Sequence, residues 1–106
     1  MNYSYRNVKG VVVDAGHGGS DPGAVANNRL EKDYTLKAAN YIYERLNNLG
    51  IPAVLTRDTD RTLSRDERVS KMVNSFGNGS DVIVLSNHIN AGGGEYPTTQ
   101  HNLIGY

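Results

Sequence analysis

Two histidines of the chain have the residue type and the placement of metal ligands. His17 lies just past the apolar segment Gly10–Ala15, and His88 lies just past a second apolar segment, residues 82–85. Short β-branched segments of this kind, bounded by glycine and polar residues, are typical of buried strands. In a parallel sheet the carboxyl ends of the strands share one edge, and ligands bind there. We therefore expect both imidazoles at the same edge of a sheet.

Glu31 is a third candidate ligand, because it lies in the first turn of the helix predicted after the first strand. A crossover helix begins at the edge where its strand ended. Two imidazoles and one carboxylate leave the fourth position of a zinc ion open, which is typical of a catalytic rather than a structural site. Each residue alone has a simpler explanation: Glu31 complements the helix dipole, and a histidine beside glycines hydrogen-bonds the loop backbone. Convergence of all three at one edge favours zinc.

The elements that must position these residues begin with the strand at Gly10–Ala15. Residues 16–28 are rich in Gly, Asn, Asp and Pro and predict a loop. Apolar residues then recur at helical spacing between residues 30 and 49, and Gly50 followed by Pro52 ends that helix. Residues 53–56 predict a second short strand.

A second helix is expected after Ser64, which forms a capping box with Glu67. This helix stops at Gly77, and the third strand follows. The order β-α-β-α-β predicts an α/β fold with a mostly parallel sheet and right-handed crossovers. No periodic segment follows Asn90, so residues 95–106 are expected to be an irregular tail. One face of the second helix carries the apolar residues Val69, Met72, Val73 and Phe76.

Composition excludes several classes of partner and binding site. The 106 residues suffice for one domain, residues 1–106, and 11 basic residues balance 11 acidic ones, so no nucleic-acid partner is expected. The chain has no cysteine, so a metal must bind to histidines and carboxylates. No apolar segment is long enough for membrane insertion, and the polar N-terminus does not resemble a signal peptide. We also expect no obligate protein partner.

Two further polar residues are candidates for orienting the imidazoles. Asp14 ends the first strand, and Asn90 lies two residues past His88. Both residue types also form turns through their own side chains, which is an equally good explanation for each. His101 lies in the expected tail and is predicted to be an exposed loop residue.

Residues 9–94 resemble the zinc-dependent N-acetylmuramoyl-L-alanine amidases, the family often called amidase type 3. The resemblance rests on four segments in the family's order: VDAGHGG with DPGA at 13–24, LEKD at 30–33, LTR at 55–57 with Asp60 and Arg68, and SNHIN at 86–90. It implies that His17, Glu31 and His88 are the zinc ligands. The family hydrolyses the amide bond between N-acetylmuramic acid and L-alanine in peptidoglycan, with zinc-activated water as nucleophile and a glutamate as general base and acid.

The resemblance ends before that catalytic glutamate. The family carries it on a later strand, and residues 95–106 do not resemble that segment, so the catalytic residue is unknown. Glu95 offers a carboxylate near the second histidine segment, but no geometric reason prefers it. We therefore expect an α/β domain that is shortened relative to the full amidase domain. It would act on the bacterial cell wall as an autolysin or endolysin, and it would stay in the cytoplasm until released. The alternative is a catalytically silent fragment that binds zinc or peptidoglycan.

Overall fold

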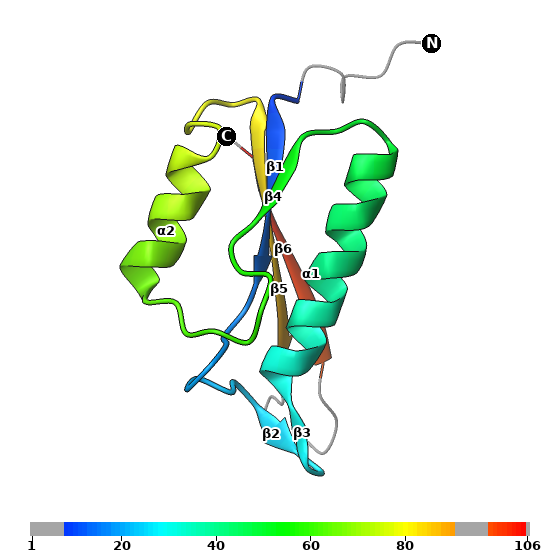
Figure 1. The fold of residues 1–106 in the computed structure, drawn as a ribbon, viewed down its shortest axis with the longest axis vertical. Helices are drawn as coiled ribbons and strands as arrows, with labels where there is room; N and C mark the ends of the chain where they lie inside the picture. The colour runs from blue at the N-terminus through cyan, green and yellow to red at the C-terminus, as the bar shows by residue number, and fades with distance from the viewer. Residues whose placement is uncertain (1–7, 91–97, 106) are drawn as a thin grey trace.

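The computed structural model describes residues 8–90 and 98–105, and it has the predicted α/β architecture (Figure 1). Four strands form the sheet in the order β4-β1-β5-β6. These are β4 (Ala53–Leu55), β1 (Gly10–Ala15), β5 (Val82–Asn90) and β6 (Thr98–Gly105). Strand β1 pairs in parallel with both β4 and β5, whereas β6 runs antiparallel to β5. The predicted β-α-β-α-β order and its parallel sheet are confirmed.

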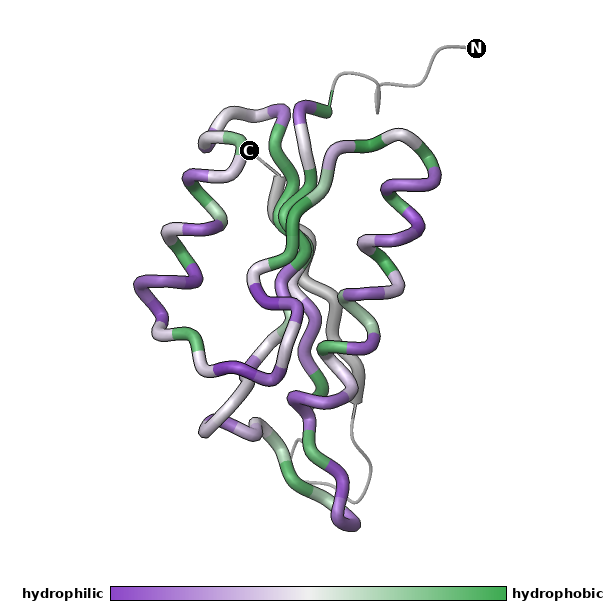
Figure 2. Tube along the Cα trace, in the orientation of Figure 1, coloured by the Kyte–Doolittle hydropathy of each residue, from purple (hydrophilic) through white to green (hydrophobic). Residues whose placement is uncertain are grey.

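Helices cover both faces of the sheet. Helix α1 (Glu31–Asn48) packs against β1, β4 and β5, and α2 (Arg65–Asn74) lies on the opposite side (Figure 1). All six residues of β1 are buried, as expected for a central strand covered on both faces. Figure 2 shows hydrophobic colour at the start of the central strands and hydrophilic colour toward their carboxyl ends. The core on the α1 face joins Val11, Val13 and Ala15 to Ala39, Ile42 and Leu46.

Helix α2 begins as predicted but packs less closely than its apolar face suggests. The hydroxyl of Ser64 accepts from the Glu67 amide, and the Glu67 carboxylate accepts from the Ser64 amide, so the capping box is confirmed. However, Val69 and Val73 remain 48% and 41% exposed. They border an apolar groove of about 370 Å³ between α2 and β5, which is lined by Val69, Met72, Val73, Gly77, Asn78, Val82 and Val84.

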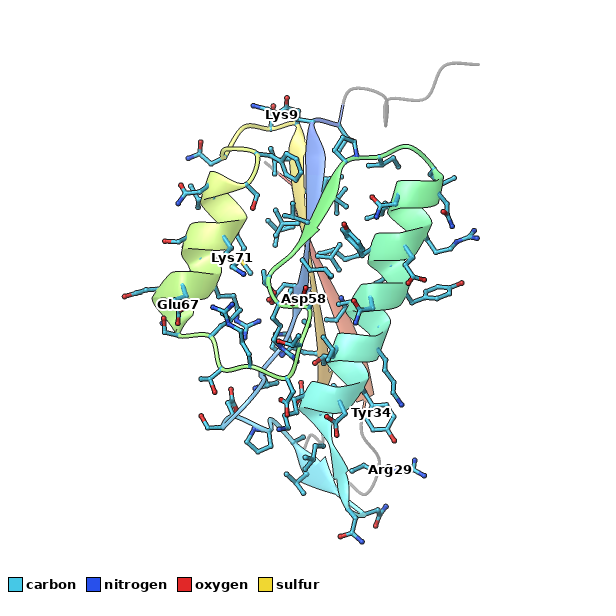
Figure 3. All side chains as sticks on the ribbon, viewed as in Figure 1. Lys9, Arg29, Tyr34, Asp58, Glu67 and Lys71 are labelled. Carbon is cyan, nitrogen blue, oxygen red and sulfur yellow. The ribbon has the colours of Figure 1, made fainter. Side chains whose placement is uncertain are left out.

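Polar contacts fasten α2 to the sheet. Lys71 projects from α2 toward the sheet (Figure 3), where its Nζ donates to the carbonyl oxygen of Thr56 at 2.7 Å. Just past the C-terminal end of the helix, the Phe76 ring lies against Gly10, so closely that a Cβ at Gly10 would meet ring atoms at 2.5 Å. Glycine at the start of β1 therefore makes room for the aromatic ring.

Three expectations about the strands are wrong. His88 lies within β5 rather than past its end, because β5 continues to Asn90 by pairing with β6. Residues 98–105 form β6 and are not irregular, since hydrogen bonds from β5 order a segment that lacks apolar periodicity. The expected loop at 16–28 contains part of a two-stranded hairpin, β2 (Val25–Ala26) with β3 (Arg29–Leu30). Its turn is formed by Asn27 and Asn28, both with positive φ.

Neither helix in the described ranges, 8–90 and 98–105, has the length and apolar content needed to cross a membrane.

Candidate metal centre

The structure brings together the three side chains that the sequence nominated. His17 lies in the loop after β1, Glu31 is the first residue of α1, and His88 lies in β5. One ligand atom from each lies within 4.8 Å of the other two. The Oε2 of Glu31 is 3.1 Å from His17 Nε2 and 3.4 Å from His88 Nδ1. The two rings are nearly perpendicular, with centroids 5.1 Å apart. Three elements far apart in sequence therefore meet at the carboxyl end of the sheet.

The two separations from the Glu31 carboxylate suit a zinc ion. Zinc–nitrogen and zinc–oxygen bonds of about 2.0–2.1 Å in a tetrahedron separate neighbouring ligand atoms by roughly 3.3 Å. The two separations from Glu31 Oε2 lie close to that value. Two imidazoles and one carboxylate are also a donor set that zinc prefers, and both histidine side chains remain partly exposed, at 25% and 32%. The cluster can hold a metal ion with one side open to a substrate.

Asp21 orients the first imidazole. Its Oδ2 lies 2.9 Å from His17 Nδ1, which leaves Nε2 of the same ring to face Glu31. The hydrogen bond to His17 lowers the pKa of the Asp21 carboxyl, and the amide of Gly23 also donates to it. A carboxylate behind a metal-binding histidine fixes the tautomer and the ring orientation. The sequence pattern did not predict this orienting role for Asp21, although Asp21 lies only four positions after His17.

Backbone amides hold the Glu31 carboxylate, which is 5% exposed. Its Oε1 accepts from the Ala24 amide at 2.9 Å, and its Oε2 accepts from the Ile89 amide at 2.8 Å. The Ile89 amide belongs to the residue after His88, so one carboxylate links α1 to β5 at the site. The two amides therefore fix the positions of both carboxylate oxygens of Glu31.

Two glycines allow the side chains to approach each other. A Cβ at Gly16 would lie 2.5 Å from Cε1 of His88. A Cβ at Gly23, whose φ is +70°, would lie 2.6 Å from Cδ2 of His17 and 2.7 Å from Oε1 of Glu31. Any larger residue would displace a candidate ligand, and at Gly23 it would also strain the backbone.

The other residues nominated for the site lie elsewhere. The expectation that Asp14 orients an imidazole is not supported by its contacts, because its carboxylate accepts from Thr56, Arg68 and Ser86 instead. The backbone of Asn90 ends β5, but its side chain lies outside the described part of the chain. His101 is paired with Asn87 in β6 rather than lying in a loop, and Glu95 lies outside the described residues.

A loop after β4 holds the segment that follows His17. The Asp60 carboxylate accepts from the Gly19 amide at 2.7 Å and from Lys32 Nζ at 2.8 Å. These donors, Lys32 first, lower the pKa of the Asp60 carboxyl. The hydroxyl of Thr62 accepts from the Ser20 amide at 2.8 Å. The loop that carries the first histidine is therefore tied to both the β4 side and α1.

Comparison with known proteins identifies the family. Residues 11–100 match the profile of a family described as N-acetylmuramoyl-L-alanine amidase. The chain belongs to the N-acetylmuramoyl-L-alanine amidase family. Among its relatives, amidase CwlM of Bacillus licheniformis is 42% identical over 86 residues, and the sporulation-specific amidase of Bacillus subtilis (strain 168) is 38% identical over 86 residues. Each match covers 79% of this chain and 32% of the relative, so the chain spans about a third of their length.

Solved amidase structures have the same fold. The catalytic domain of the amidase CwlV from Bacillus (Paenibacillus) polymyxa var. colistinus superposes with a TM-score of 0.72 at 34% identity. That match covers 82% of this chain and 48% of the CwlV chain. The chain thus corresponds to about half of a solved amidase catalytic domain.

Proposed function

We propose that the chain supplies the zinc-binding part of an N-acetylmuramoyl-L-alanine amidase and takes part in hydrolysis of the amide bond between N-acetylmuramic acid and L-alanine in peptidoglycan. The observation that carries this proposal is the convergence of His17, Glu31 and His88, with ligand atoms within 4.8 Å of one another. Amidase family membership supplies the substrate class. The place of action is the bacterial cell wall.

The chain's own residues account for binding and orientation. His17 and His88 present imidazole nitrogens, and Glu31 presents a carboxylate oxygen held by two backbone amides. Zinc bound to them would polarise the amide carbonyl and make water a stronger nucleophile at neutral pH. Asp21 holds the His17 ring so that Nε2 keeps facing the site. The partly exposed sides of both rings leave access for a substrate.

The proton transfer needs a further group. The cluster within the described ranges contains a single carboxylate, that of Glu31, and this carboxylate is used as a ligand. Loss of a general base typically reduces hydrolysis by about 10²–10⁴-fold. This observation favours a second candidate function, a domain that binds zinc or peptidoglycan without cleaving it.

One experiment separates the two functions. The purified chain is incubated with zinc and peptidoglycan, and newly exposed L-alanine amino groups are quantified. Release that is abolished by EDTA and by His88→Ala, but retained in His101→Ala, supports the amidase. Zinc binding without release supports the silent domain. If the chain binds neither zinc nor peptidoglycan, both proposals are wrong.

A further inference from the structure

Two arginines converge on the backbone of the loop that carries His17. Arg57, just past β4, donates from Nε to the Ala15 carbonyl oxygen at 3.2 Å and from Nη2 to the Gly16 carbonyl oxygen at 3.0 Å. Arg68, on α2, donates from Nη1 to the Ala15 carbonyl oxygen at 2.6 Å and from Nη2 to the His17 carbonyl oxygen at 3.0 Å. Three consecutive carbonyl groups, just where β1 ends, are therefore held by two guanidinium groups from separate elements.

The backbone at this point needs such support. His17 has a φ of +64°, a left-handed conformation that residues with a side chain adopt rarely. This conformation turns the chain sharply after β1 and directs the imidazole to Glu31. The next turn is closed by hydrogen bonds in both directions between the backbones of Gly18 and Asp21, so Asp21 is brought to the ring by the same reversal.

Arg57 is committed to this task. It is 2% exposed, so it cannot contact a substrate, and its other donors reach the carbonyl oxygens of Thr59 and Lys32 and the hydroxyl of Thr35. Arg57 takes part in none of the ion pairs that the described side chains form. A buried cation that donates to several main-chain oxygens and one hydroxyl group holds backbone geometry rather than neutralising an acid.

Arg68 couples the same carbonyl groups to the interior. Its Nη1 also pairs with the buried Asp14 carboxylate, which accepts from the hydroxyl groups of Thr56 and Ser86. Asp14 therefore fixes Arg68, and Arg68 fixes the backbone of residues 15 and 17. Asp14, predicted to orient an imidazole directly, instead acts on the loop through Arg68.

We propose that Arg57 and Arg68 are positioning residues for the metal centre: together they lock the carbonyl groups of residues 15–17 and so hold His17 in the conformation that presents Nε2 to Glu31. This inference rests on the proposed metal site. A lysine at either position keeps the positive charge but offers a single ammonium group, which cannot bridge carbonyl oxygens as a planar guanidinium does.

The test compares Arg57→Lys and Arg68→Lys with two matched controls. Arg61→Lys changes an exposed arginine of the same loop, and Arg65→Lys changes an exposed arginine of the same helix. Zinc affinity is measured by competition with a chromophoric chelator, and the visible spectrum of the cobalt(II)-loaded chain reports ligand geometry. We expect roughly 10–100-fold weaker zinc binding and an altered cobalt spectrum in the two test variants only.

A metal-free measurement makes the outcome independent of the proposed function. Amide hydrogen exchange is followed by NMR in the metal-free chain, where the amides of Gly16 and Gly18 are hydrogen-bonded to Asn87 and Asp21. We expect these two amides to lose protection in Arg57→Lys and Arg68→Lys while the amide of Val12, in the middle of β1, keeps it. Unchanged exchange at Gly16 and Gly18 would overturn the proposal. So would an equal loss at Val12, because that result would mean general destabilisation.

The two failures are distinguishable. If the unaltered chain binds no zinc, the proposed function is wrong, whereas the exchange measurement still decides whether the arginines hold the loop. If the unaltered chain binds zinc and the lysine variants bind it equally well, the positioning role is wrong and the metal site stands.

Discussion

At the scale of single residues, the two ring nitrogens of His17 have different contacts. Nδ1 lies against Asp21, and Nε2 lies against Glu31. Asp14, three residues before His17, faces Thr56, Arg68 and Ser86 instead. The direction of the ring is therefore set by a residue that the chain reversal at Gly18 brings back to it.

Asp21→Asn tests this arrangement. The amide side chain keeps an oxygen acceptor for His17 but loses the negative charge, so the imidazole becomes a weaker ligand. We expect zinc affinity to fall roughly 10–100-fold, measured by chelator competition. Asp33→Asn, which removes an exposed carboxylate from the first turn of α1, serves as the control and should leave the affinity unchanged. Equal affinities in all three proteins would exclude an orienting role for Asp21.

The sequence predicted the three candidate ligands but not their supporting contacts. One rule predicted His17, Glu31 and His88 as ligands. Parallel strands end, and crossover helices begin, at the same edge of a sheet. The choice of Asp21 over Asp14 depends on the positive φ of His17, and the amino-acid sequence does not specify this angle for a residue other than glycine. The roles of Arg57 and Arg68 depend on which carbonyl groups the loop after β1 leaves for side chains to bind. That, too, is a property of the folded chain and not of the residue pattern.

At the scale of elements, the loop 58–62 is a brace for the ligand-carrying loop. Asp60 connects it to the Gly19 amide and to Lys32, and Thr62 connects it to Ser20. Because α1 carries Lys32, this brace joins the loop after β1, the segment after β4 and the helix that begins with Glu31. Distortion of the brace would be transmitted to two of the three candidate ligands.

The brace predicts a pH-dependent contribution to stability. Lys32 and the Gly19 amide lower the pKa of Asp60 below its ordinary value of 3.8 in the folded chain. Its contribution is therefore fully present above pH 3.8 and is lost as the pH falls through the lower, folded-state pKa. The difference in urea midpoint between the unaltered chain and Asp60→Asn should be constant near neutral pH and shrink below pH 3.8. A difference that persists unchanged in acid would contradict this contribution. Asp58→Asn, at a neighbouring exposed position, is the control.

Elements with strong local patterns were predictable, and those created by pairing were not. The three parallel strands are marked by short apolar segments. Both helices are marked by apolar residues at helical spacing and a glycine after their last turn, and α2 also by its capping box. Strand β6 has no such pattern and is ordered by its antiparallel pairing with β5. Strands β2 and β3 have two residues each, too few for any periodicity, and depend on the turn at Asn27 and Asn28.

At the scale of the whole molecule, the two faces of the sheet are unequally packed. Helix α1 buries Ala39 against the sheet, whereas α2 has no buried residue and leaves the apolar groove beside Val69 and Val73. The CwlV catalytic domain is about twice as long as the part of it that this chain matches. The more densely packed side and the candidate metal centre are contained in the described residues.

Unequal packing predicts unequal sensitivity to truncation. Val13→Ala removes two methyl groups from a fully buried site and should lower the free energy of unfolding by roughly 2 kcal/mol. Val69→Ala, at a site that is 48% exposed, should change it by less than about 0.5 kcal/mol. Urea unfolding followed by circular dichroism measures both. A similar loss in the two variants would mean that the α2 face is closed in solution.

Metal binding should stabilise the whole chain. Zinc at about 100 times its dissociation constant should raise the free energy of unfolding by about 2.7 kcal/mol if it binds only the folded state. Chelation with EDTA should reverse the increase, and Glu31→Gln should abolish it. Thermal unfolding with and without zinc provides the measurement, and an equal shift in Glu31→Gln would indicate zinc binding elsewhere.

The pairing of β1 with β5 also sets the order of events when the protein is made. Gly10 pairs with Val82, 72 residues later, so the two central strands meet only after both helices and β4 have been synthesised. Contacts between such distant segments form slowly, because a long loop must close before they add stability. A nascent chain that has not yet reached β5 carries His17 and Glu31 without their third partner and leaves one side of β1 unpaired. We therefore expect the site to assemble as one of the last steps of folding, after residue 88 has left the ribosome.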